Sequence, residues 1–147
     1  MTIIEQLEQN HMLVAAIISW ALAQFIKIII DIIRIKKFDW RLIFATGGMP
    51  SSHSSFVMAL ATTVGLEEGF NTTLFAIAAA FAIVVMYDAQ GVRQEAGKQA
   101  RIINLMIANI ENSGVKLDKN LKELLGHTPL EVTGGAILGL VVGILMS

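Results

Sequence analysis

Long apolar stretches constrain the fold of this sequence more than any other feature. Residues 12–33 carry no strongly polar side chain apart from Gln24, Lys27 and Asp31, which fall in its second half. A helix needs about 20 such residues to cross the hydrocarbon core of a bilayer. Hydrophobic residues make up 54% of the chain and charged residues only 16%, whereas a soluble domain carries roughly a quarter charged residues. The chain is therefore expected to be an integral membrane protein.

Three more apolar stretches complete the expected architecture. They cover residues 52–67, 72–87 and 129–146, and the first of these is short for a membrane span. With residues 12–33 they predict an all-α fold, an integral membrane helical bundle with four transmembrane helices. The whole chain, residues 1–147, is short enough to form a single membrane domain.

An amphipathic helix is expected between the last two spans, over residues 90–110. Its apolar side chains recur at helical spacing. They are Ile102, Ile103, Met106, Ile107 and Ile110. Polar and charged residues are common at the other positions, so the helix is expected to lie at the membrane interface.

The basic residues are distributed unevenly along the chain. Ten of the eleven fall in two predicted loops, residues 34–50 and 88–127, and the eleventh, Lys27, lies within the first span. Because Lys and Arg are enriched in short cytoplasmic loops, both loops are expected in the cytoplasm and both termini outside. The formal net charge of −1 gives no reason to expect nucleic acid as a partner, and the absence of cysteine excludes disulfides and thiol catalysis.

Two cations mark the end of the first span. Lys27 and Arg34 are seven positions apart, which is about two helical turns, so they share one helix face. Such side chains often extend to the lipid headgroups, and this reading needs no function. They can equally bind an anion together.

The segment Gly-Gly-Met-Pro-Ser-Ser-His-Ser-Ser, residues 47–55, leads into the second span. Ser51 or Ser52 can cap that helix, and the free N–H groups of a helix N-terminus attract anions. His53 would stand in the first turn, where it can exchange a proton near neutral pH. A plain helix start explains the serines equally well.

Two further polar clusters flank the long loop. The first, Asp88-Ala89-Gln90-Gly91-Val92-Arg93, is followed by more cations and can serve either recognition or contact with anionic lipid. The second joins His127 to a Thr-Pro-Leu-Glu sequence ending at Glu131, which has the pattern of a capping box with proline at the first helical position. The predicted topology brings all four clusters to one membrane face, where they could hold a phosphate and offer a nucleophile and an acid.

These motifs resemble those of the type 2 phosphatidic acid phosphatase superfamily, which includes bacterial acid phosphatases and vanadium haloperoxidases. Its first motif, Lys-x6-Arg-Pro, is matched by Lys27 and Arg34, although Ile35 replaces the proline. Its second motif, Pro-Ser-Gly-His, is matched by residues 50–53, with Ser52 in place of glycine.

The third superfamily motif, Ser-Arg-x5-His-x3-Asp, is matched only at its end. His127 is followed at the right spacing by Glu131 instead of aspartate, and Asn120 and Leu121 stand where the Ser-Arg pair is expected. The segments GGMPSSHSS, YDAQGVRQEAGKQARIIN and LGHTPLEVTGGAILG are similar to those of a divergent branch of the superfamily, small bacterial and plastid membrane proteins. This resemblance covers nearly the whole chain.

The resemblance implies a role for each matching residue. His127 would be the nucleophile, Glu131 would orient it, and His53 would protonate the leaving alcohol. The remaining residues would bind phosphate oxygens, with Arg93 in place of the missing arginine: Lys27, Arg34, Ser51, Ser52 and Arg93.

The function expected first is therefore hydrolysis of a lipid phosphate monoester through phosphohistidine at the cytoplasmic face, with no metal or cofactor. The expected partners are membrane lipids and a phosphorylated lipid. The alternative is a non-catalytic lipid-phosphate binder or transporter, and an assembly protein is the least specific reading. The glycines at 135, 139 and 143 permit close helix packing, either in a homo-oligomer or within one subunit.

Overall fold

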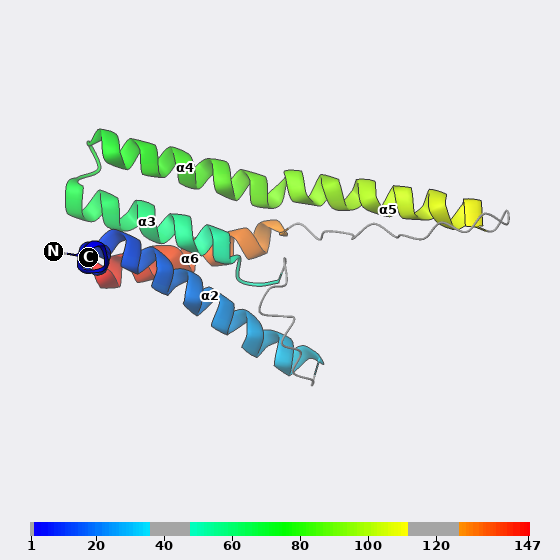
Figure 1. Cartoon of the computed structure of the whole chain (residues 1–147), viewed down its shortest axis with the longest axis horizontal. Coiled ribbons are helices and arrows are strands. Elements are labelled where there is room, and N and C mark those ends of the chain that lie inside the picture. The colour runs from blue at the N-terminus through cyan, green and yellow to red at the C-terminus, as the bar shows by residue number, and fades with distance from the viewer. Residues whose placement is uncertain (1, 36–47, 112–126) are drawn as a thin grey trace.

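The computed structural model describes residues 2–35, 48–111 and 127–147, which form an all-α fold (Figure 1). The helices in these ranges are α1 (Ile3–Glu8), α2 (His11–Ile35), α3 (Ser52–Glu68), α4 (Thr73–Gln90), α5 (Val92–Glu111) and α6 (Pro129–Met146). No strand occurs among these residues. The all-α prediction is confirmed, and α5 lies within two residues of the amphipathic helix expected at residues 90–110.

Short polar side chains start the central helices, and a glycine ends the first of them. Ser51 caps α3 and Thr72 caps α4, each accepting a hydrogen bond from a backbone N–H three residues later. The chain leaves α3 at Gly69, whose φ of 105° is in the region that favours glycine. The turn that follows reverses the chain, so α4 runs back along α3.

Helix α3 is the centre of the bundle. It packs against α2, α4 and α6, whereas α5 contacts only α4 among the described helices. Figure 1 shows α5 continuing the direction of α4 beyond the end of the bundle. Both termini lie at the bundle end that carries the α3–α4 turn. This arrangement agrees with termini on one side of the membrane, while their position outside stays a prediction.

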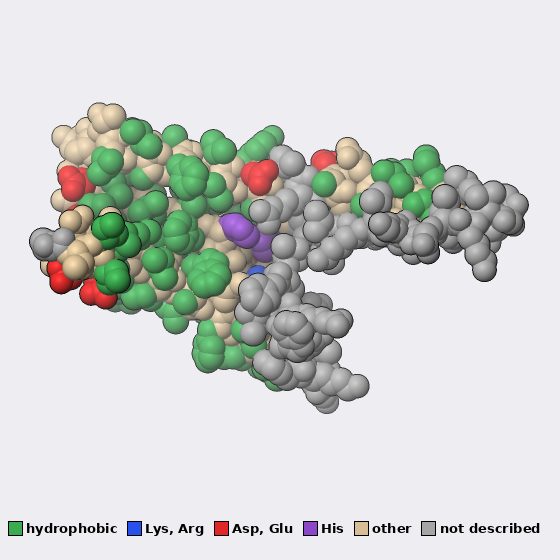
Figure 2. All heavy atoms as spheres, in the orientation of Figure 1, with side chains coloured by type: hydrophobic (Ala, Val, Ile, Leu, Met, Phe, Trp, Pro, Cys, Tyr) green, Lys and Arg blue, Asp and Glu red, His purple; other side chains and the backbone are tan. Residues whose placement is uncertain are grey.

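Small residues form the interior, and large apolar residues cover the outside. On α2 the buried positions include Ala15, Ser19 and Ala23, which repeat every four residues along one side of the helix. Ser19 of α2 and Ser55 of α3 join these two helices through a 2.6 Å hydrogen bond between their hydroxyls. Isoleucine, leucine and phenylalanine side chains are exposed over the bundle surface (Figure 2). This pattern suits a lipid environment, where helices associate through close packing of small residues.

The glycine stripe of α6 lies directly against α3. A Cβ added at Gly135 would collide with the carbonyl oxygen of Ser51, and one at Gly139 would collide with that of Ser55. At Gly143 it would lie 2.7 Å from Cβ of Thr62. These glycines therefore allow close packing within one chain, which was one of the two expected uses. Self-association through the same residues stays a prediction.

Three helical stretches in the described part of the chain are long and apolar enough to cross a membrane: His11–Ile33, Thr73–Asn109 and Pro129–Met146. They agree with three of the four expected spans, and the second of them extends through α4 into α5. Helix α3, expected as the remaining span at residues 52–67, has 17 residues and several Ser and Thr side chains. A count of four spans stays a prediction.

Candidate functional site

The polar clusters predicted from the sequence meet at the end of the bundle opposite the termini. Two backbone hydrogen bonds fix this end. The Ser51 N–H donates to the Glu131 carbonyl at 2.9 Å, and the His127 N–H donates to the Ala89 carbonyl at 3.1 Å. The starts of α3 and α6 and the end of α4 are thus tied together, although they are far apart in the sequence.

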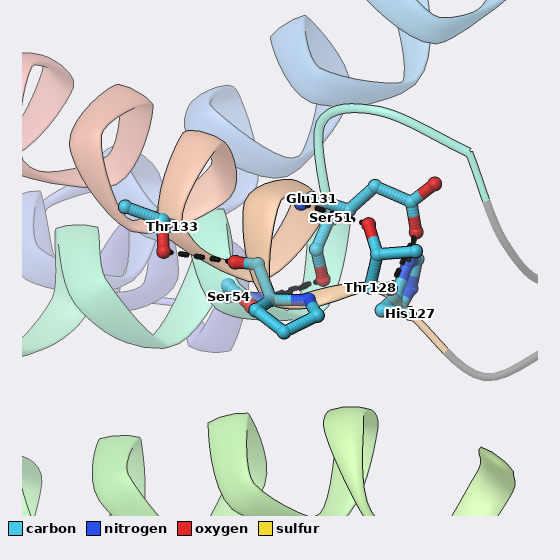
Figure 3. A network of polar contacts seen from close by, with 7 residues as sticks. Ser51, Ser54, His127, Thr128, Glu131 and Thr133 are labelled. Atoms are coloured by element: carbon cyan, nitrogen blue, oxygen red, sulfur yellow. Dashed lines mark hydrogen bonds and ion pairs between the residues drawn. The ribbon is translucent and has the colours of Figure 1, made fainter.

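His127 is held by a carboxylate on its own helix turn (Figure 3). Its Nδ1 lies 3.1 Å from Oε2 of Glu131, and the same oxygen accepts a hydrogen bond from the Thr128 N–H at 3.0 Å. The Thr128 side chain accepts from the Glu131 N–H in return, which completes a capping box. The cap therefore fixes the carboxylate, and the carboxylate in turn fixes the imidazole and leaves its Nε2 on the other side of the ring.

His53 is the ring neighbour of His127. The two ring centroids are 6.4 Å apart and the planes are inclined by 59°. His127 is nearly buried, with 2% of its surface exposed, whereas His53 is exposed. Figure 2 shows histidine side chains on the surface at this end of the bundle, beside a basic side chain. The exposed imidazole of His53 and the buried imidazole of His127 are thus close enough for a group the size of a phosphate to contact both.

Lys27 is buried inside the bundle. Only 3% of its surface is exposed. A Cβ on Gly48 would lie 3.3 to 3.6 Å from the Cγ, Cδ and Cε atoms of Lys27, so the lysine methylenes run past Gly48. A charged side chain held at this depth is a functional candidate.

The two serines predicted to bind phosphate are both buried. Ser51 has 0% exposure, and its Oγ accepts hydrogen bonds from the Ser54 hydroxyl at 3.0 Å and the Ser54 N–H at 3.4 Å. The capping role expected as the alternative is therefore present. Ser52, 4% exposed, is the first residue of α3, where helix geometry leaves the backbone N–H without an intrahelical partner.

Two predicted phosphate ligands cannot be placed in the same way. The backbones of Arg34 and Arg93 belong to α2 and α5, but their side chains lie outside the described part of the structure. Lys98, on the exposed surface of α5, forms a 2.7 Å ion pair with Glu95. Within the described ranges, no group of three His, Asp or Glu side chains is arranged to hold a metal ion.

The sequence matches a family described as the Divergent PAP2 family over residues 8–142. The chain belongs to this family. It is also 40% identical to a protein of Bacillus subtilis (strain 168) described as "Uncharacterized membrane protein YuiD", over 97% of each chain. No solved structure matches the chain. The match to a divergent branch of the phosphatase superfamily, expected from the motifs, is confirmed, and so is the membrane-protein assignment.

Sequence reasoning missed some contacts that build the site. The Ala89 carbonyl, which anchors His127, lies in a polar segment that drew attention for its charged residues. The packing of Gly48 on Lys27 joins two motifs that were considered separately. The contact between Gly48 and Lys27 leaves no signal in the sequence, because it depends on how α2 lies against the segment that leads into α3.

Proposed function

We propose that this protein is a phosphatase that hydrolyses a phosphate monoester carried by a lipid. The observation that carries the proposal is the imidazole of His127, oriented by Glu131 at 3.1 Å and facing a second imidazole at a centroid distance of 6.4 Å. A nucleophile oriented by a carboxylate, with an acid on the far side of a gap, is the arrangement that phosphoryl transfer to histidine requires.

The first step would use the two histidines in different protonation states. Nε2 of His127 attacks phosphorus while Glu131 accepts the hydrogen bond from the protonated Nδ1. The P–O bond to the lipid breaks, and protonated His53 gives its proton to the leaving oxygen. The products are a lipid alcohol and phosphohistidine. A substrate would approach from the side of His53, which is the exposed member of the pair.

The second step would return the enzyme to its starting state. Neutral His53 accepts a proton from water as the water oxygen attacks phosphorus. The P–N bond to His127 breaks, and inorganic phosphate leaves. Both steps place an acid or base within a short distance of the reacting oxygen, which is the geometry that general acid–base catalysis needs.

The negative charge of the phosphate requires positive groups at the same place. Lys27 lies at this end of the bundle, beside Gly48, which is close in sequence to the start of α3 at Ser52. The backbone N–H of Ser52 at the start of α3 is a second donor. Arg34, Ser51 and Arg93 are proposed as further ligands on the strength of the motif match alone.

A non-catalytic binder or transporter of lipid phosphates is the second candidate. The observation favouring it is the capping box, because Thr128 and Glu131 would form it for stability alone. A buried Lys27 next to a helix N-terminus would also hold a phosphate without any chemistry.

The test is phosphate release by the purified protein in liposomes. The substrates are phosphatidate, phosphatidylglycerophosphate and a polyprenyl phosphate, and the variant is His127→Ala. The matched control is His11→Ala, since His11 is an exposed histidine at the start of α2, at the end of the bundle away from the site. If the protein is a phosphatase, we expect phosphate release by the wild type and by His11→Ala. Folded His127→Ala should show only background phosphate release. No release by folded wild-type protein from any of the three lipids would reject the phosphatase in favour of the binder.

A further inference from the structure

We infer that a groove between α3, α4 and α6 holds one hydrocarbon chain of the phosphorylated lipid whose headgroup reaches His127. This inference rests on the proposed function and adds to it the path of the substrate in the membrane. It names a lipid with an extended acyl or prenyl chain as the substrate, in preference to a water-soluble phosphate ester.

The groove has a volume of about 360 Å³ and a lining that is almost wholly apolar. Met58 and Leu66 of α3 form part of its floor, Ala79 and Ile83 of α4 line one wall, and Leu140 of α6 lines the other. Thr62 is the polar exception, but its hydroxyl donates to the Met58 carbonyl at 2.7 Å. The lining therefore offers almost no hydrogen-bonding group to water or to a polar ligand. A hydrocarbon chain is the occupant that fits such a surface.

The groove exists because α4 and α6 both pack on α3 but make only sparse contact with each other. Glycines bring α6 close to α3. The side chains of α6 that border the groove therefore lie close to the surface of α3. On α4 the positions facing the space include Ala79 and Ala82, which are too small to fill it. The two walls therefore stand apart over the central helix.

Two aromatic rings line the groove at the end nearest the termini. Phe70 and Phe75 meet edge to face with ring centroids 4.9 Å apart. Gly65 leaves the space that the Phe70 ring occupies, because a Cβ at this position would collide with the ring. From Phe75 to Met86 the groove follows α4 for about 16 Å, at roughly 1.5 Å per residue.

The other end of the groove points to the histidine site. Met86 is the groove residue nearest that end of α4. One turn further along the helix, the Ala89 carbonyl accepts the hydrogen bond from the His127 N–H. A lipid with its chain along α4 would therefore carry its phosphate to the end of the bundle where protonated His53 and Lys27 supply positive charge and His127 supplies the nucleophile.

The experiment uses photo-crosslinking in liposomes, with a diazirine placed midway along one acyl chain of phosphatidate. The comparison lipid is diacylglycerol with the same diazirine chain. Wild type and His127→Ala are both labelled, because labelling needs no turnover, and the labelled residues are mapped by mass spectrometry. We expect phosphatidate to label groove residues of α4 several-fold more than diacylglycerol does, and unlabelled phosphatidate to compete.

A pair of neighbouring alanines provides matched variants. Ala79 lines the groove, whereas Ala80 is exposed and outside it. Ala79→Phe should cut the phosphatidate label several-fold, and Ala80→Phe should leave it unchanged. Equal labelling by the two lipids, or equal labelling of the two variants, would overturn the inference.

The proposed function and this inference can fail separately. Phosphate release with labels outside the groove would keep the phosphatase and reject the groove. Phosphate-dependent labels inside the groove without any release would keep the groove as a lipid-phosphate site and reject the phosphatase.

Discussion

The two sides of α3 are built in opposite ways. Toward α6, glycines let backbone meet backbone so closely that a single methyl group would not fit. Toward α4, an apolar groove of about 360 Å³ remains. The tight side sets the position of Glu131 and His127, through the hydrogen bond from Ser51 to the start of α6. The open side leaves space for a ligand. Close packing of small residues thus positions the polar site on one side of α3. The other side of the same helix keeps an open groove.

The largest effect on activity is expected from a change at Glu131, the carboxylate positioned by the close packing of α6 on α3. Glu131→Gln keeps a side chain able to form the capping box but replaces the charged oxygen that faces Nδ1 of His127. Phosphate release should fall about a hundredfold, as expected when a catalytic group loses its orientation. Thermal unfolding in detergent should change little. A loss of stability that matched the loss of activity would assign Glu131 to the helix cap alone.

The next effect tests the tight packing itself, with two adjacent glycines. Gly135→Ala drives a Cβ into the Ser51 carbonyl, whereas Gly134→Ala brings it to 3.2 Å from the end of the flexible Met49 side chain. We expect Gly135→Ala to lower the free energy of unfolding by about 1–3 kcal/mol and Gly134→Ala to have little effect. Equal stability of the two variants in thermal unfolding would show that α3 and α6 are not packed this closely.

The serine pair between α2 and α3 extends the comparison to a polar contact. Ser55→Ala removes the 2.6 Å partner of the buried Ser19 hydroxyl but keeps the Ser55 carbonyl, to which that hydroxyl donates at 3.1 Å, so the change should cost about 0.5–1.5 kcal/mol. The double variant Ser19→Ala with Ser55→Ala removes both hydroxyls and should be less destabilising than the sum of the single changes. Strict additivity in thermal unfolding would mean that the two hydroxyls do not interact.

The smallest effect is expected on the open side. Ala79→Leu adds three carbon atoms in the groove, where space is available, so the free energy of unfolding should change by less than about 0.5 kcal/mol. Ala79→Leu adds more atoms than Gly135→Ala does, but it should change the free energy of unfolding less. A destabilisation of similar size in the two variants would remove the difference between the two faces.

The sequence predicted the helices well because apolar length and capping residues are local properties. Residues 129–146 were expected as a span, and α6 has these bounds, with its Thr128–Glu131 capping box. The predicted topology puts His53 and His127 at one membrane face, and the resemblance to a superfamily implies their roles as acid and nucleophile, whereas no local rule joins residues so far apart. The use of the glycine stripe within one chain was left open, because spacing alone does not say which helix lies opposite.

Some features could not be predicted because they depend on how helices cross. Lys27 is as consistent with a headgroup contact as with burial when it is considered within α2 alone. Its 3% exposure and the approach of Gly48 show that the lysine stem is enclosed. The groove is likewise invisible in the sequence, since an alanine such as Ala79 signals close packing as readily as open space.

The most direct test of the account is to trap the covalent intermediate on His127. Protein in liposomes would be mixed with phosphatidate carrying a radioactive phosphate and denatured at alkaline pH after a short time, because phosphohistidine is lost in acid. The account predicts label on the peptide that contains His127, absent in His127→Ala and retained in His11→Ala. Release of phosphate from the lipid by wild-type protein with no label at His127 would contradict it.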